Sequence, residues 1–216
     1  MKRIRAHFSA RLLAGPTKEE PVAPPPVEPV APEPPEEEFP VPEDDEQELS
    51  GKDTSLTPAQ MKQGIPSLFN KVPWKPGARV FDIGAGKPIM VDSLRQWFID
   101  KDMTYLPYDK YNGDPYNYVT LNELRSRRAD IATASNLLNI VAEPKQRIII
   151  YKQMYYALMP GGRFYISVYY DPKKQPYQSG RDRWQNHLKP EGYLDEIKTV
   201  FPDARIQSGV ITGTKI

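Results

Sequence analysis

The run FDIGAGKP at positions 81–88 constrains the fold of this chain more than any other segment. The short apolar run 78–83 predicts a buried β-strand. The glycines that follow let the backbone turn sharply and approach a ligand closely, and Pro88 suits the first turn of a helix. We therefore expect a strand, a tight turn and a helix whose N-terminus offers unpaired amides and a positive dipole end to a ligand.

Strands and helices alternate along the C-terminal three quarters of the chain. The expected strands are 78–83, 103–108, 129–134, 163–170, 204–207 and 210–215, with 116–120 as a further candidate, and the expected helices are 57–71, 88–100, 143–158 and 190–201. This alternation predicts an α/β fold with a Rossmann-like, doubly wound and mostly parallel sheet. The last two strands are joined by Ser208-Gly209, so we expect the last strand to be antiparallel. Gly64 and Pro66 weaken the first helix.

The N-terminal part has a different composition. Residues 1–18 form a basic leader with five basic residues and no acid. The segment 19–55 follows it, and twelve acidic residues and no basic ones lie in 19–49. Because proline lacks an amide donor and the glutamates repel each other, we expect a disordered Pro/Glu-rich linker. The remaining residues, 56–216, are expected to form one domain.

Charge and composition narrow the function classes. The net charge of +1 conceals an excess of 24 basic over 16 acidic residues from Ser50 onward. This excess favours a nucleic acid or another polyanion as partner, although the same charges also keep a domain in solution. The absence of cysteine excludes disulfides, thiolate metal sites and cysteine nucleophiles. The two histidines, His7 and His187, are far apart, so we expect no metal site.

Two acidic residues suggest the ligand of the glycine turn. Asp82 precedes the glycines, where a carboxylate can bind an amine-bearing or cationic ligand. Ile89 stands where a dinucleotide site would want a third glycine. These two features favour S-adenosylmethionine over a nicotinamide cofactor. Asp109 lies 25 residues after Gly84, where an acid at the end of the next strand usually binds ribose hydroxyls. The alternatives are a strand-turn-helix junction with incidental glycines for the motif of Asp82, and an ordinary turn aspartate for Asp109.

These segments resemble class I S-adenosylmethionine-dependent methyltransferases over about residues 56–216. VFDIGAGKP is similar to motif I of that family, and Asp109 matches the acid after its second strand. ADIATASNLLNIV and LMPGGRFYISVYY resemble the segments around its fourth and fifth strands, and FPDARIQSGVITGTKI resembles its sixth and seventh strands, the seventh being antiparallel. The SNLLN sequence is similar to that of small methyltransferase-like proteins of bacteria and phages.

The resemblance implies roles for residues of these motifs. The methionine end of S-adenosylmethionine would be held by Asp82, Gly84, Ala85 and Gly86. Asp109 would bind the ribose, Lys110 would lie beside the adenine, and Tyr118 would line the adenine pocket. Ser135 and Asn136 would face the position from which the methyl group leaves, as the catalytic candidates. Asn136 would also contact the cofactor and orient an acceptor amine or hydroxyl.

The fourth-strand segment departs from one branch of the family. Amino-group DNA methyltransferases of the best-known kind carry Asp or Asn, then Pro-Pro and an aromatic residue, where this chain has SNLL at 135–138. That mechanism is therefore not supported. The segment holds no obvious general base, but methyl transfer to a good nucleophile can depend mainly on alignment. Strand-end capping is the alternative role for Ser135 and Asn136.

The segment 169–190 is the expected substrate region. It follows the segment that resembles the family's fifth strand, so we expect it to lie over the ligand-binding edge of the sheet. Its cations can neutralise phosphates, and its aromatic rings can stack on bases. The substrate-binding candidates are Lys173, Lys174, Arg181, Arg183 and Trp184. A solvated loop with Trp184 in the core is the alternative. His187 is a candidate acid or base, although a lone histidine is more often structural.

The expected function is therefore methyl transfer from S-adenosylmethionine to an N or O acceptor, with nucleic acid among the acceptors. A small-molecule or protein methyltransferase is one alternative, and a catalytically silent interaction module is another. No apolar run approaches the roughly 20 residues that span a bilayer, so we expect no membrane partner. We expect the cytoplasm of a bacterial or phage-infected cell, or an organelle if the leader 1–18 is a targeting peptide.

Overall fold

The structure is a computed structural model that describes residues 64–112, 118–178 and 184–216. The predicted basic leader and Pro/Glu-rich linker lie outside these residues, as does the first part of the predicted helix 57–71. Within the described residues, no helix is long and apolar enough to cross a membrane.

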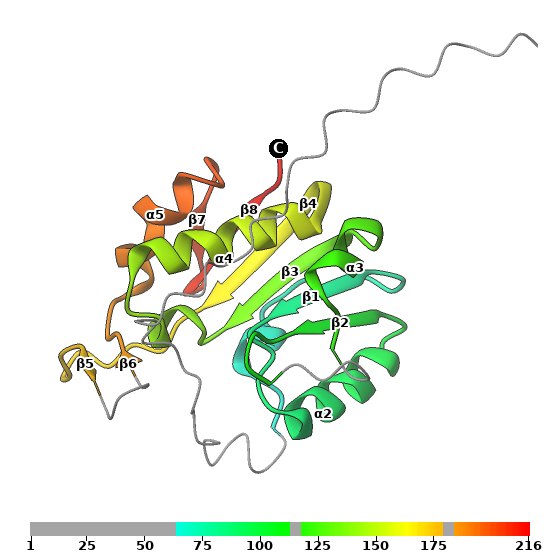
Figure 1. Ribbon diagram of the computed structural model, residues 1–216, viewed down its shortest axis with the longest axis horizontal. Helices are drawn as coiled ribbons and strands as arrows, with labels where there is room; N and C mark the ends of the chain where they lie inside the picture. The colour runs from blue at the N-terminus through cyan, green and yellow to red at the C-terminus, as the bar shows by residue number, and fades with distance from the viewer. Residues whose placement is uncertain (1–63, 113–117, 179–183) are drawn as a thin grey trace, which may run out of the picture. The chain divides into compact units, whose positions relative to one another are not determined.

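A six-stranded sheet forms the centre of the domain, in the order β2-β1-β3-β4-β8-β7 (Figure 1). The parallel strands are β1 (Arg79–Ile83), β2 (Thr104–Tyr108), β3 (Ala129–Ser135) and β4 (Leu158–Ser167). β8 (Val210–Thr214) runs antiparallel to both β4 and β7 (Arg205–Gln207). The predicted Rossmann-like, mostly parallel sheet with an antiparallel last strand is confirmed.

Helices cover both faces of the sheet (Figure 1). One face packs on α2 (Pro88–Ile99) and the 3₁₀ helix η1 (Ser67–Asn70), and the other packs on α3 (Leu121–Ser126), α4 (Pro144–Ala157) and α5 (Leu194–Lys198). Successive side chains of a strand point to opposite faces. Val80 of β1 accordingly lies in the α2 core, and Phe81 lies in the core beneath α4.

Several predicted elements have different bounds in the structure. Residues 64–71 form only a coil and η1. Gly64 is unfavourable in a helix, and Pro66 has no amide to donate a helical hydrogen bond. The predicted helix 190–201 is divided into η3 (Pro190–Tyr193) and α5. β4 already begins at Leu158, with a register shift opposite residues 129–131 of β3. The described residues 118–120 of the strand candidate 116–120 form no strand.

Two short elements occupy segments for which no helix or strand was predicted. The 3₁₀ helix η2 (Leu138–Ile140) follows β3, and a two-stranded hairpin of β5 (Tyr177–Gln178) and β6 (Trp184–Gln185) follows β4. In Figure 1 the hairpin lies on the side toward which the arrowheads of β3 and β4 point. It therefore stands near the carboxyl edge of the sheet.

The strand order places a ligand-binding position next to β1. From β1 the chain passes to β2 on one side, and it then returns to form β3 on the other side. In open α/β sheets, ligands bind beyond the carboxyl ends of the strands at such a reversal of strand order. The loop after β1 lies at this position.

Candidate functional site

The loop between β1 and α2 makes a sharp turn at the carboxyl edge. Gly84 and Gly86 have φ values of 71° and 83°, in a region that other residues rarely adopt. The amides of Gly84 and Ala85 both donate to the Tyr108 carbonyl, at 2.8 and 3.1 Å. A Cβ on Gly86 would meet no atom within 4 Å, whereas a Cβ on Gly84 would lie 2.8 Å from Cδ1 of Leu137. Gly86 therefore faces open space.

Asp82 lies in β1 just before this loop and is 3% exposed. Its Oδ1 accepts a hydrogen bond from the Thr133 hydroxyl at 2.7 Å, and its Oδ2 accepts one from the Tyr105 hydroxyl at 2.8 Å. Burial raises the pKa of Asp82 to about 6, the two hydroxyls oppose this rise, and the charge of Asp109 adds to it. A buried carboxylate thus lies at the start of the glycine loop.

Asp109 follows β2 and connects the glycine loop to the next turn. Its Oδ2 accepts from the amide of Gly86 at 2.9 Å. Its Oδ1 accepts from the amides of Tyr111 and Asn112 at 3.0 and 2.9 Å, and from the Asn112 side chain at 3.0 Å. Oδ1 therefore has three donors and Oδ2 has one. Oδ2 keeps a second lone pair, which a ribose hydroxyl can use.

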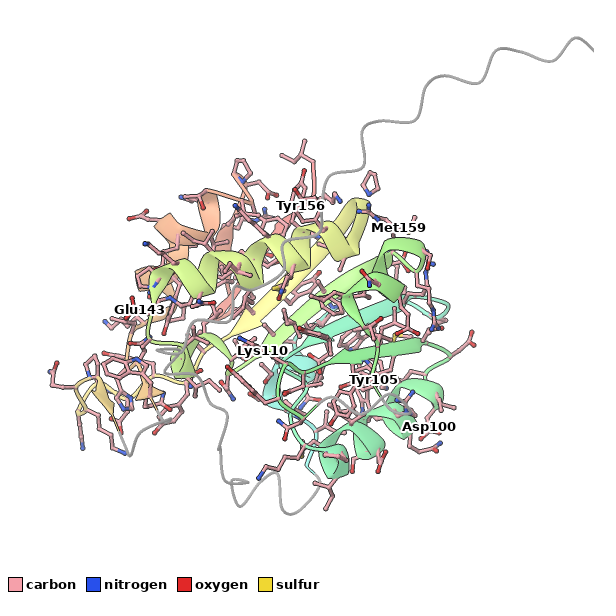
Figure 2. The ribbon with its side chains drawn as sticks, viewed as in Figure 1. Asp100, Tyr105, Lys110, Glu143, Tyr156 and Met159 are labelled. Atoms are coloured by element: carbon pink, nitrogen blue, oxygen red, sulfur yellow. The ribbon has the colours of Figure 1, made fainter. Side chains whose placement is uncertain are left out.

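The two predicted adenine-side residues also lie at this loop. Tyr118 is buried, and its hydroxyl donates to the Gly86 carbonyl at 2.7 Å, so it supports the turn directly. The Nζ of Lys110 lies 5.3 Å from the ring centroid of Tyr111. In Figure 2, Lys110 lies toward the carboxyl ends of the strands, whereas Tyr105 lies between β2 and α2. The predicted cofactor residues of motif I are therefore close to Lys110 and Tyr118.

The catalytic candidates lie at the end of β3, beside the glycine loop. Ser135 pairs with Ser167 of β4, and their hydroxyls are 3.5 Å apart. Asn136 is exposed and has a φ of 56°. Its backbone N–H donates a hydrogen bond to the Ser167 carbonyl at 2.8 Å. The next residue, Leu137, reaches the glycine loop at Gly84. The structure thus brings Ser135 and Asn136 next to the predicted cofactor residues and adds Ser167 to them.

The predicted substrate residues are only partly described. Lys173 and Lys174 are exposed, and Lys174 lies 3.7 Å from the carboxylate of Asp171. Trp184 is half-buried in β6, and its indole donates to the Asn186 side chain at 2.9 Å. Arg181 and Arg183 lie outside the described residues. His187 is buried, with its ring centroid 5.8 Å from that of Tyr169.

Two buried asparagines fasten the segment after the hairpin to the turn after β3. The backbone N–H of Asn186 donates to the backbone carbonyl of Asn139 at 2.5 Å. The side chain of Asn186 donates to the Val141 carbonyl at 3.2 Å. The side chain of Asn139 accepts from the amide of Tyr169 at 3.4 Å. These two residues were not predicted, because the sequence of a loop gives no sign that its asparagines are buried.

Arg147 of α4 secures the same turn from the other side. Its Nη1 donates to the carbonyls of Val141 and Ala142 at 2.8 and 2.7 Å. Its Nε and Nη2 form a bidentate pair with Glu196 of α5 at 2.8 and 2.6 Å. This ion pair was not predicted either, because charges in an amphipathic helix usually face water. The turn after β3 is therefore held by buried polar groups on both sides.

Taken together, the strand order, the antiparallel last strand and the glycine loop are those that the resemblance to class I methyltransferases implies. Within the described residues, no group of three or more His, Cys, Asp or Glu side chains could hold a metal ion. The glycine loop defines the site, with the carboxylate of Asp82 in β1 and that of Asp109 directly after β2.

No family model matches the sequence, and neither does any curated protein. Among solved structures, the chain is similar to human N-acetylserotonin methyltransferase in complex with SAM (11% identity, TM-score 0.48, 69% of this chain and 50% of that one). It is also similar to 1,6-didemethyltoxoflavin-N1-methyltransferase of Burkholderia thailandensis with bound S-adenosylhomocysteine (17% identity, TM-score 0.47, 65% of this chain and 72% of that one). A third similar structure is the glycopeptide N-methyltransferase MtfA with bound S-adenosylhomocysteine (14% identity, TM-score 0.47, 68% of this chain and 86% of that one). The match thus spans half the length of the human enzyme.

Proposed function

We propose that this protein is an S-adenosylmethionine-dependent methyltransferase that acts on an N or O acceptor. The glycine loop carries the proposal. It turns at the reversal of strand order, it leaves open space at Gly86, and it lies between the carboxylates of Asp82 and Asp109. S-adenosylmethionine has a cationic methionine end and a ribose diol, and both suit carboxylates placed in this way.

The residues at the loop divide the cofactor between them. The charge of Asp82 would attract the ammonium group of the cofactor. The first turn of α2 would offer its positive dipole end to the carboxylate of the cofactor's methionine part. Asp109 would accept a ribose hydroxyl with the second lone pair of its Oδ2. Lys110 and Tyr118 would border the adenine, as the resemblance implies. Each of these contacts would use a residue that lies at or next to the glycine loop.

The acceptor would enter between the ends of β3 and β4. S-adenosylmethionine supplies a methyl group on a sulfonium, and its transfer needs an acceptor atom aligned behind the carbon. The exposed Asn136 side chain would orient an acceptor amine or hydroxyl. Ser135 and Ser167 lie directly beside it and add two hydroxyls.

Calorimetric titration of the full chain with S-adenosylhomocysteine tests the cofactor site. We expect a dissociation constant on the order of micromolar, as is common for enzyme ligands, and its loss in Asp82→Ala. Asp92→Ala is the matched control, because Asp92 is an exposed aspartate on α2. Absence of binding by the folded wild-type protein would instead favour the catalytically silent interaction module.

A nucleic acid acceptor is a narrower proposal within this function. The chain from Ser50 carries eight more basic than acidic residues, and Lys173 and Lys174 are exposed on the segment after β4. Cations placed in this way can neutralise phosphates, and this binding weakens with salt. Binding of a small-molecule or peptide acceptor would not depend on salt in this way.

A further inference from the structure

Two hydroxyls below the glycine loop belong to no motif. Tyr105 of β2 and Thr133 of β3 lie on the two strands that flank β1, and each donates to one oxygen of Asp82. The ring of Tyr105 stacks on Phe98 of α2, with centroids 4.7 Å apart. The hydroxyl–carboxylate–hydroxyl group therefore crosses three neighbouring strands on the face that α2 covers.

We infer that Tyr105 and Thr133 are positioning residues of the cofactor site, which hold the Asp82 carboxylate as the fixed negative charge for the cationic end of the cofactor. This inference rests on the proposed function and extends it to two residues outside the glycine motif. Neither residue needs to touch the cofactor, because both act through Asp82.

The geometry supports this role. With one donor on each oxygen, the carboxylate is fixed against rotation about its Cβ–Cγ bond. Each oxygen keeps a second lone pair, which a ligand or a bridging water can use. The two distances, 2.8 and 2.7 Å, are those of well-formed O–H···O hydrogen bonds. Asp82 can therefore be bonded on both sides and still receive a ligand.

The surroundings of Asp82 act in both directions on its ionisation. Burial raises its pKa and Asp109 adds to the rise, whereas the hydroxyls of Thr133 and Tyr105 lower it. Around Tyr105, the further charged or titratable neighbours are Tyr118 and Arg95. The two hydroxyls are therefore the groups that keep the carboxylate charged near neutral pH, when a cation must be bound.

A purely structural role for the two hydroxyls predicts a different result. Hydroxyls that only connect strands would, when removed, weaken ligand binding equally at every pH or not at all. Hydroxyls that maintain the charge of Asp82 would, when removed, weaken binding mainly at low pH. The dependence of binding on pH therefore separates the two roles.

The test is calorimetric titration of the full chain with S-adenosylhomocysteine at pH 6 and pH 8. The variants are Tyr105→Phe and Thr133→Val, which remove one hydroxyl each. Tyr165→Phe is the control, because Tyr165 is a buried tyrosine of β4 in the same core as Tyr105. For a rise of about one unit in the pKa of Asp82, we expect binding about five-fold weaker at pH 6 and nearly unchanged at pH 8.

Each other outcome contradicts a defined claim. Equal weakening at both pH values, no change in either variant, or the same effect in Tyr165→Phe would overturn the positioning role. Absence of binding by the wild-type protein at both pH values would overturn the proposed function, and the positioning role with it. Thermal unfolding at both pH values shows that each variant is folded.

Discussion

Asp82 is a buried carboxylate whose charge opposes folding. Its pKa is raised from 3.8 to about 6 in the folded protein, so the folded state holds the proton more tightly than the unfolded state. The stability that this proton contributes is complete below pH 3.8 and is lost as pH rises through 6. The difference amounts to about 3 kcal/mol at 1.36 kcal/mol per pKa unit.

The first prediction follows from this cost. Asp82→Asn keeps the shape of the side chain and removes the charge. We expect the variant to be more stable than the wild type at pH 8 by up to about 3 kcal/mol, and the difference to shrink toward pH 4. Urea unfolding at pH 4, 6 and 8 measures it. A difference that does not vary with pH would contradict the raised pKa of Asp82.

The glycine loop carries a second prediction, which separates backbone strain from close contact. Gly84→Ala places a residue at a φ of 71° and a Cβ 2.8 Å from Leu137 Cδ1, so both costs apply. Gly86→Ala has a φ of 83° and open space, so only the strain applies, about 1–2 kcal/mol. Gly84→Ala should therefore cost more than Gly86→Ala.

Leu137→Ala measures the part due to contact. In a double-mutant cycle, we expect Gly84→Ala and Leu137→Ala to be coupled by roughly 1 kcal/mol in the free energy of unfolding. Gly86→Ala and Leu137→Ala should be additive. Coupling of the same size in both pairs would show that the loop responds as a whole and that the contact with Leu137 is not specific.

At the scale of elements, α4, α5 and the turn after β3 are joined by one ion pair. The Arg147 side chain is 5% exposed and that of Glu196 is 20% exposed, so each charge depends on the other. Breaking a buried pair from one side leaves an uncompensated charge. The turn that carries Asn136 also loses the two hydrogen bonds from Arg147.

The third prediction is a large loss of stability in Arg147→Met, about 3–5 kcal/mol, because Glu196 remains without its cation. Arg147→Met combined with Glu196→Met should recover part of this loss, since neither charge is then buried alone. Denaturant unfolding of the two variants and of Glu196→Met measures the coupling. If the double variant were as unstable as the sum of the single ones, the hydrogen bonds to the turn would be the main contribution.

The elements differ in how well the sequence predicts them. β1 and α2 are close to their predicted bounds, because an apolar run, two glycines and Pro88 mark a strand, a turn and a helix start. α3 was not predicted, although Thr120 and Glu123 form a capping box, because a helix of six residues has too few turns for a clear apolar period. β4 begins early because the turn sequence at 159–162 enters the sheet as an irregularity.

The same contrast applies to the site. The glycines, Asp82 and Asp109 stand in a recognisable order, so local sequence could identify them. Tyr105 and Thr133 could not be identified, because they meet Asp82 only after three strands have paired in one register. Three of the four donors on Asp109 come from the turn that follows it, which is the common pattern of an aspartate at a turn. Only the bond from Gly86 depends on how the strands pair.

At the scale of the whole molecule, opposite charges are separated along the sequence. The segment 19–49 has twelve acidic residues and no basic ones, whereas the chain from Ser50 has an excess of eight basic residues. An acidic segment on the same chain has a high effective concentration at a basic surface, on the order of millimolar for a short flexible link. It can therefore compete with a polyanion for that surface.

The last prediction tests this competition. Deletion of residues 1–50 should tighten binding of a fluorescently labelled oligonucleotide, because it removes the acids at 36–48 that we expect to compete with phosphates for the same cations. Anisotropy titrations at 50 and 200 mM salt measure the affinity and its salt dependence.

The control is the full chain with the acids of 36–48 changed to Gln and Asn, which keeps the leader and the chain length. Tighter binding in both variants supports competition by charge, since the deletion also removes the basic leader and the control does not. Unchanged or weaker binding in both would contradict it, and the acceptor search would then turn to small molecules and peptides.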